Sequence, residues 1–141
     1  MNVRDLALKP LILLHKTVFR ASEGRLLSRG SGMPVLMLTT TGRKSGQKRT
    51  TMLTTPLEEG NRIMLVASNG GDHKDPDWLL NLRADPHVDV TRDGATRPMT
   101  ARVAGPDEKA TLWPRIVADH DHYGGYQDKT DRDIPVVVLE P

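Results

Sequence analysis

The order of hydrophobic and polar positions predicts a helix, three strands, a helix, two strands, a helix and a final strand. Runs of aliphatic and β-branched residues mark the strands, and clusters rich in glycine, proline or charge separate them. The predicted strands cover residues 34–41, 50–57, 62–67, 87–92, 97–103 and 134–139. Short connections between consecutive strands favour antiparallel hairpins. The predicted fold class is therefore α+β, mainly antiparallel β, with the sheet closed into a small barrel that helices cover.

Local turn and helix signals support this order. Asp93 and Gly94 are typical of a two-residue hairpin turn. A short helix is predicted from Pro76, with Asp75 as its N-cap and Pro86 beyond its end. A longer helix is predicted over residues 106–119, and residues 119–133 are predicted to form a flexible loop.

Residues 1–30 are predicted to form a separate amphipathic helical segment, and residues 31–141 a single domain. Leu11, Leu14 and Val18 recur at helical spacing, and cations occupy the opposite face. The uncharged apolar stretch is much shorter than the ~20 residues that a membrane-spanning helix needs. The segment has two interpretations: a helix packed on its own domain, or a basic helix lying on an anionic bilayer. The second predicts a cytoplasmic protein with peripheral membrane contact.

Composition and charge narrow the functional classes. The chain has no cysteine, which excludes disulfides, thiolate nucleophiles and thiolate metal sites. Its net charge of +2 is unevenly distributed, because residues 1–49 hold ten Lys/Arg against two Asp/Glu. This basic part indicates an anionic partner. Nucleic acid is disfavoured, because no aromatic residues are interleaved with the basic segment for base stacking.

The densest cluster of cations is the glycine-containing turn at residues 42–49. It contains Arg43, Lys44, Lys48 and Arg49 around Ser45. Its spacing matches neither a Walker A loop nor a dinucleotide-binding glycine motif. The turn is either a solvated hairpin connection or a site for phosphate and carboxylate oxygens.

Two further segments have the residue types of a ligand site. The loop at 68–71 has paired glycines, which let a backbone approach a ligand closely. Residues 119–133 present His120, His122, Tyr123 and Tyr126. A histidine pair can bind metal, but no third histidine and no cysteine lies nearby, so no metal is predicted. A loop that presents both tyrosines over a pocket is favoured.

Three blocks occur in order along residues 34–141: TTTGRKSGQKRTTML, then VASNGGDHKDPDWLLNLRADPHVDV, then LWPRIV followed by YGGYQDKTDRDIPVVVLEP. Together they resemble the deazaflavin-dependent nitroreductase family. These are coenzyme F420-dependent reductases of the split β-barrel type, and they include quinone reductases. The resemblance implies a flavin-binding-like split barrel, which agrees with the barrel predicted from the strand pattern.

The resemblance also implies which residues bind the cofactor, a deazaflavin with a phosphate and a tail of glutamates. The implied contacts of the tail and phosphate are Arg43, Lys44 and Ser45. Those along the cofactor are Arg49, Thr50, Thr51, Met52, Leu53 and Thr54. Those at the ring are Val66, Ala67, Ser68 and Asn69. A further matching segment comprises Asp77, Trp78, Leu79, Leu80 and Asn81.

The activity that the resemblance implies is hydride transfer from reduced F420 (F420H2) to a quinone, an activated alkene or a nitro-type acceptor. The predicted catalytic residues are Ser68, Tyr123 and Tyr126. Ser68 is the predicted hydrogen-bond donor to the acceptor, Tyr123 a second donor or proton source, and Tyr126 borders the substrate pocket. Thr54 stands where a nitro-drug-activating relative has tyrosine. That difference favours quinone or enone reduction over nitro-prodrug activation.

Two alternatives to this function are retained. One is an oxidoreductase that binds flavin mononucleotide on the same barrel. The other is a module that binds an anionic ligand without catalysis. The sequence leaves monomer and dimer open.

Overall fold

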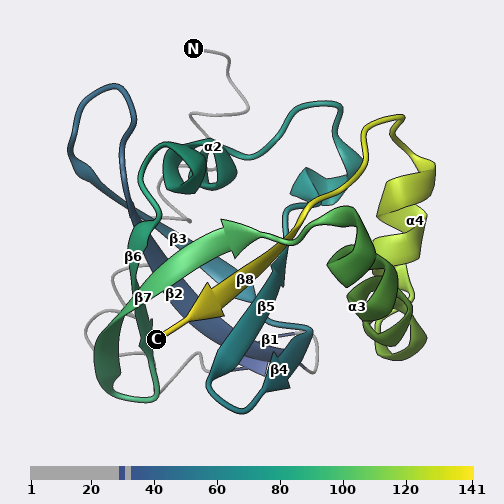
Figure 1. Ribbon diagram of the computed structural model, residues 1–141, viewed down its shortest axis with the longest axis horizontal. Helices are drawn as coiled ribbons and strands as arrows, with labels where there is room; N and C mark the ends of the chain where they lie inside the picture. The colour runs from purple at the N-terminus through teal and green to yellow at the C-terminus, as the bar shows by residue number, and fades with distance from the viewer. Residues whose placement is uncertain (1–28, 31–32) are drawn as a thin grey trace.

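The computed structural model describes Arg29, Gly30 and residues 33–141, and the predicted N-terminal helix lies outside these residues (Figure 1). The described strands are β1 (Arg29–Gly30), β2 (Met33–Thr41), β3 (Lys48–Thr54), β4 (Leu57–Glu59), β5 (Arg62–Val66), β6 (His87–Arg92), β7 (Ala95–Val103) and β8 (Val136–Glu140). The described helices are the short η1 (Asn69–Gly71), α2 (Asp77–Ala84), α3 (Pro106–Asp119) and α4 (His122–Asp128). No helix within these residues has the length and apolar character that would span a bilayer.

One antiparallel sheet holds all the described strands. Its order is β1-β2-β6-β7-β8-β5-β4, and β3 pairs with β2 off this path. β6 and β7 lie between β2 and β8, so strands from the beginning and the end of the domain share one sheet. The mainly antiparallel α+β fold predicted from the sequence is confirmed.

The strand predicted over residues 50–57 is wrong at its C-terminal end. The chain bends at Thr55 and Pro56, and β4 then pairs with β5 instead of β2. Proline has no N–H for a sheet ladder, so the bend is the expected consequence of Pro56. The buried Thr55 hydroxyl lies 3.1 Å from the carbonyl oxygen of Met64 in β5, which fixes the bend.

The core has two parts that lie on opposite faces of β5 and β8. The first part includes Leu36 and Leu38 of β2, and Val35 and Met37, which alternate with them, are buried in a small separate cluster. The second part includes Met64 and Val66 of β5 together with Val138 of β8. Because these two strands are buried on both faces, their sequences are continuous apolar runs rather than alternating ones.

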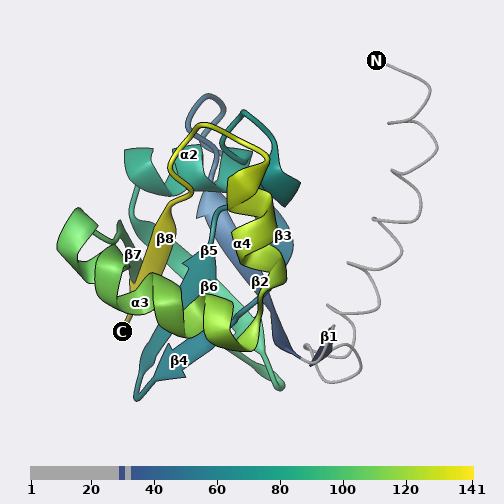
Figure 2. The same ribbon diagram turned by 90° about the vertical axis from the view of Figure 1, so that its right-hand side faces the viewer.

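The helices cover these two parts separately. α2 lies across one end of the strands, where Leu79 and Leu82 enter the first part of the core (Figure 1). α3 and α4 lie together on one side of the sheet, where Leu112, Ile116 and Tyr123 enter the second part (Figure 2). The loop predicted at 119–133 is therefore wrong over residues 122–128, which form α4. Gly124 and Gly125 weaken the local helix signal, and packing of Tyr123 against α3 supplies the stability that the sequence pattern lacks.

The predicted hairpin turn at Asp93 and Gly94 is confirmed. Both residues have positive φ, 51° and 81°, as a type I′ turn requires. The strand that follows begins at Ala95, two residues before the predicted start, because Ala95 and Thr96 pair with Arg92 and Thr91.

An acid-sensitive ion pair joins α3 to the sheet. Arg102 donates to Glu108 and to Glu140, and the bond from Arg102 lowers the pKa of Glu108. A carboxyl with a lowered folded pKa stabilises the fold above its unfolded pKa of about 4.3 and loses this contribution as the pH falls through the folded pKa.

We expect Glu108→Gln to lower the free energy of unfolding by about 1 kcal/mol at pH 7, as is typical of an accessible ion pair. The difference from the unsubstituted protein should shrink as the pH falls below 4. Urea unfolding at pH 7 and pH 3 measures it. An equal difference at both values would contradict the ionic role of Glu108.

Candidate functional site

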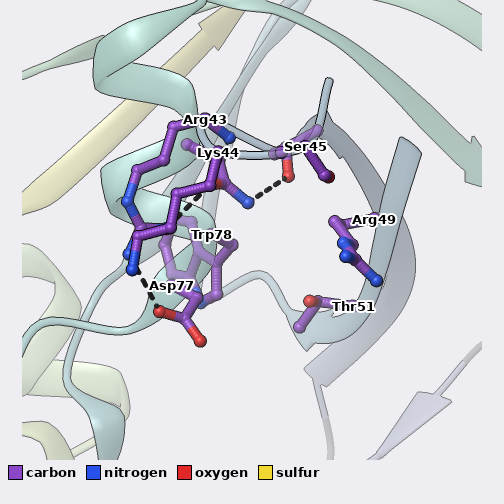
Figure 3. Close-up of a pocket in the computed structure, with 10 residues that line it drawn as sticks. Arg43, Lys44, Ser45, Arg49, Thr51, Asp77 and Trp78 are labelled. Carbon is purple, nitrogen blue, oxygen red and sulfur yellow. Dashed lines mark hydrogen bonds and ion pairs between the residues drawn. The ribbon is translucent and has the colours of Figure 1, made fainter. Parts of the chain in front are cut away.

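A basic cavity of about 430 Å³ lies beside the turn between β2 and β3. The turn is closed by two backbone bonds, from the Gly42 amide to the Gln47 carbonyl and from the Gly46 amide to the Gly42 carbonyl. A side chain at Gly42 would meet Ser45 Oγ at 2.8 Å, so the tight turn requires glycine there. The turn directs Arg43 and Lys44 to one side of the cavity and β3 places Arg49 on the other (Figure 3).

Arg43 ties this turn to α2. Its backbone amide and its guanidinium both donate to Asn81 Oδ1, at 3.2 and 2.9 Å, and the guanidinium also lies 3.4 Å from Asp77. The amide of Asn81 is buried and donates in turn to Thr40 at the end of β2. Much of the hydrogen-bonding capacity of Arg43 is therefore used within the protein.

Lys44 and Arg49 differ from Arg43 in this respect. Neither side chain makes a hydrogen bond or an ion pair with any residue in the described part of the chain, and both line the basic cavity. Ser45 Oγ accepts a bond from the Gln47 amide, which leaves its hydroxyl hydrogen free to donate. These two cations and the hydroxyl donor suit phosphate and carboxylate oxygens.

A second cavity of about 520 Å³, here called the ring cavity, adjoins the first. Its walls come from β3, from β5 and the segment that follows it, and from α4. Thr51 and Trp78 line both cavities, so the two form one groove with a cationic end and an aromatic end. The ring cavity lies where β3 and β5 are not paired with one another.

Ser68 and Tyr123 are two of the three ring-cavity residues predicted to be catalytic, the third being Tyr126. Ser68 is 9% exposed, and its hydroxyl has no hydrogen-bond partner within residues 29–30 and 33–141. Tyr123 Oη lies 3.3 Å from Thr54 Oγ1 and 3.7 Å from Met33 Sδ. Burial raises the pKa of the Tyr123 phenol above its ordinary value, so the group stays protonated at neutral pH.

An aromatic cluster forms the rest of the wall from α4. The ring of His122 lies 4.2 Å from that of Tyr123 and 5.6 Å from that of Tyr126, centroid to centroid. His122 lines the ring cavity, although the sequence analysis considered it only as a metal ligand. No group of three residues with metal-binding side chains occurs within the described residues.

The structure brings most of the predicted site residues into this one groove. Those in the basic cavity are Arg43, Lys44, Ser45, Arg49, Asp77 and Asn81, and those in the ring cavity are Met52, Leu53, Thr54, Val66, Ser68, Asn69, Tyr123 and Tyr126. Thr50, Ala67, Leu79 and Leu80 line neither cavity. Ala67 and Leu79 are fully buried in the first part of the core.

The predicted N-cap of α2 is wrong. Pro76 occupies the N-cap position without a side-chain bond. The Asp75 carboxylate instead lies 3.0 Å from Arg132 and 3.5 Å from Arg83. Arg132 is the important residue that the sequence analysis missed, because its neighbours Asp131 and Asp133 make the segment resemble a solvated charged loop.

Sequence comparison assigns the family. The sequence profile of the F420H(2)-dependent quinone reductase family matches residues 11–141. The chain belongs to this family. It is 40% identical over 134 residues to an F420H(2)-dependent quinone reductase of Mycobacterium tuberculosis (strain ATCC 25618 / H37Rv), covering 92% of this chain and 89% of that protein.

Solved structures agree with the family assignment. A structure named F420-H2 Dependent Reductase (FDR-A) has 42% sequence identity and a TM-score of 0.67, covering 76% of this chain and 94% of its own. A second, described as a domain-swapped dimer, has 36% identity and a TM-score of 0.68, covering 93% and 99%. The split-barrel fold, the F420-dependent oxidoreductase class and reduced F420 as the cofactor, all predicted from the sequence, are confirmed.

Proposed function

We propose that this F420-dependent reductase holds the charged tail of the cofactor in the basic cavity and its ring in the ring cavity. The observation that carries the proposal is the continuous groove, in which Thr51 and Trp78 join a cationic end to an aromatic end. The residues present fit such a cofactor. Lys44 and Arg49 supply cations at one end that have no partner among the described residues, and Trp78, Tyr123 and Tyr126 supply flat apolar surfaces at the other.

When bound, reduced F420 supplies the hydride for reduction of a quinone, activated alkene or nitro-type acceptor. The residues of the ring cavity bind the acceptor and stabilise charge on it. We propose that the Ser68 hydroxyl donates a hydrogen bond to the acceptor oxygen, where negative charge develops. Its free hydroxyl and its place in the cavity wall support this role.

Tyr123 has a different supporting role in this proposal. Its hydroxyl is held between Thr54 and Met33, and its ring lies in the second part of the core and in the cavity wall. It therefore fixes β3 against α4 and shapes the acceptor pocket together with Tyr126.

We expect Tyr123→Phe to lower the free energy of unfolding by about 1 kcal/mol, the usual value of a lost hydrogen bond. The kcat should fall by less than about threefold, because the ring still fills its place in the wall. Urea denaturation and steady-state kinetics measure both effects. A fall in kcat of a hundredfold would instead assign to Tyr123 the direct donor or proton-source role predicted from the sequence.

The proposed function is tested by mixing the purified protein with F420H2 and a set of quinones, enones and nitroaromatics. We expect protein-dependent oxidation of F420H2, fastest with quinones or enones, followed by the fluorescence of the oxidised cofactor. Binding of F420 without turnover of any acceptor would favour the non-catalytic alternative. Tighter binding of flavin mononucleotide than of F420 would favour the flavin alternative.

We also propose peripheral membrane contact of a cytoplasmic protein through residues 1–30. Support comes from the sequence alone, in which apolar residues recur at helical spacing opposite a row of cations. Co-sedimentation with anionic vesicles, compared with a chain lacking residues 1–28, tests this contact. Light scattering on the purified protein without vesicles distinguishes a monomer from a dimer.

A further inference from the structure

Arg132 lies between α4 and β8, and its guanidinium makes all its hydrogen bonds within the described residues to the segment 67–75. Nε donates to the Asp72 carbonyl at 3.0 Å, and Nη2 donates to the carbonyls of Ala67 and Ser68 at 3.1 and 2.8 Å. Nη1 donates to the Asp75 carboxylate at 3.0 Å. The side chain is only 15% exposed. These bonds hold both ends of the segment that forms one wall of the ring cavity.

That segment needs such support because of its backbone conformation. Asn69, Gly70 and Gly71 have consecutive positive φ values of 47°, 66° and 84°. Left-handed backbone is entropically costly for glycine, and apart from glycine few residues other than asparagine and aspartate adopt it. Ser68, Asn69 and Gly70 line the ring cavity, so the position of the Ser68 hydroxyl depends on this strained turn.

The backbone around Arg132 is fixed by α4, which forms the opposite wall of the ring cavity. Gln127 of α4 donates from Nε2 to the Arg132 carbonyl at 2.7 Å and accepts the Ile134 amide at Oε1 at 2.9 Å. The same helix carries Tyr123 and Tyr126. A chain of bonds therefore runs from the tyrosine wall, through Arg132, to the Ser68 wall.

We propose that Arg132 is a positioning residue that sets the Ser68 hydroxyl relative to the tyrosine wall and thereby to the acceptor. This inference rests on the proposed function. Arginine suits the role because its planar fork can serve three carbonyls and a carboxylate at once, whereas the single ammonium of lysine cannot. Arg132 touches neither cavity, so its effect on the reaction passes through Ser68.

The test compares Arg132→Met and Arg132→Lys with Arg102→Met as a matched control. Arg102 also bridges two acidic partners, Glu108 and Glu140, and lines neither cavity. We expect Arg132→Met to lower kcat by about tenfold or more at temperatures where the protein is folded. The dissociation constant of F420 should change by less than about threefold, because Arg132 does not line the basic cavity, where Lys44 and Arg49 are proposed to hold the charged tail. Arg132→Lys should restore only part of kcat.

Hydrogen exchange provides a readout that is independent of turnover. We expect amides in residues 67–75 to exchange faster in Arg132→Met, and to be unchanged in Arg102→Met. Unchanged exchange in Arg132→Met, a kcat equal to that of Arg102→Met, or full recovery in Arg132→Lys would each overturn the proposal. Absence of turnover in the unsubstituted protein would contradict the proposed function, and the exchange experiment would then decide the role of Arg132 by itself.

Discussion

Replacing Lys44 and Arg49 together by methionine should raise the dissociation constant of F420 by about 100-fold. Each cation can make a charge-assisted hydrogen bond worth about 1.5 kcal/mol at the low end of the usual range, and two such bonds correspond to about two powers of ten. The low end applies because both side chains are accessible to solvent, which screens their charge. Fluorescence titration of F420 at fixed ionic strength measures the change.

The matched control for this double variant replaces Arg97 and Arg115 by methionine. Both side chains belong to exposed residues that line neither cavity, and the net charge falls by the same amount. The control should keep the dissociation constant within about twofold, since distant exposed charges contribute little at physiological salt. An equal loss in both double variants would show that overall charge, not the basic cavity, attracts the cofactor.

Arg43→Met should behave differently from either variant. Its guanidinium and amide join the turn to Asn81 and Asp77 of α2. Loss of the guanidinium therefore perturbs the shape of the basic cavity as well as its charge. Arg43, Lys44 and Arg49 look equivalent in the sequence. In the structure Arg43 holds the basic cavity in shape, whereas Lys44 and Arg49 are available to a ligand in it.

Ser68→Ala should lower kcat by about 100-fold, the usual effect of removing one preorganised donor to a developing oxyanion. The dissociation constant of F420 should stay nearly constant, because Ser68 lies at the end of the groove away from Lys44 and Arg49. Steady-state kinetics with a quinone, together with the fluorescence titration, separate the two quantities.

Ser45→Ala is the contrasting variant for Ser68→Ala. Ser45 is also a serine of a tight turn, but it lines the basic cavity. Its loss should weaken F420 binding and leave kcat at saturating cofactor unchanged. If Ser68→Ala retained full kcat, Ser68 would be only part of the cavity wall and the proposed catalytic donor would be wrong.

The sequence pattern predicted the structure correctly where the structure depends on residues that are close together along the chain. The run of β-formers over residues 34–41 predicted a strand, and the apolar run up to Leu139 predicted a buried final strand. Asp93 and Gly94 specified their turn through the positive φ that they tolerate. The basic turn was located correctly because glycine and charge are local signals.

By itself, then, the sequence determined the six longer strands and, through three matching blocks, the family, but not the short strands β1 and β4. Only the tertiary structure decided which side chains pair, because such partners lie far apart in the sequence. Asp75 resembles an N-cap locally, but Arg132, 57 residues away, offers it a stronger charged partner. Arg43 is likewise bound by Asn81, 38 positions away. α4 forms although its glycines disfavour a helix, because Tyr123 packs with residues of α3 in the second part of the core. Contacts of this kind exist only after the sheet has brought the segments together, so no local pattern encodes them.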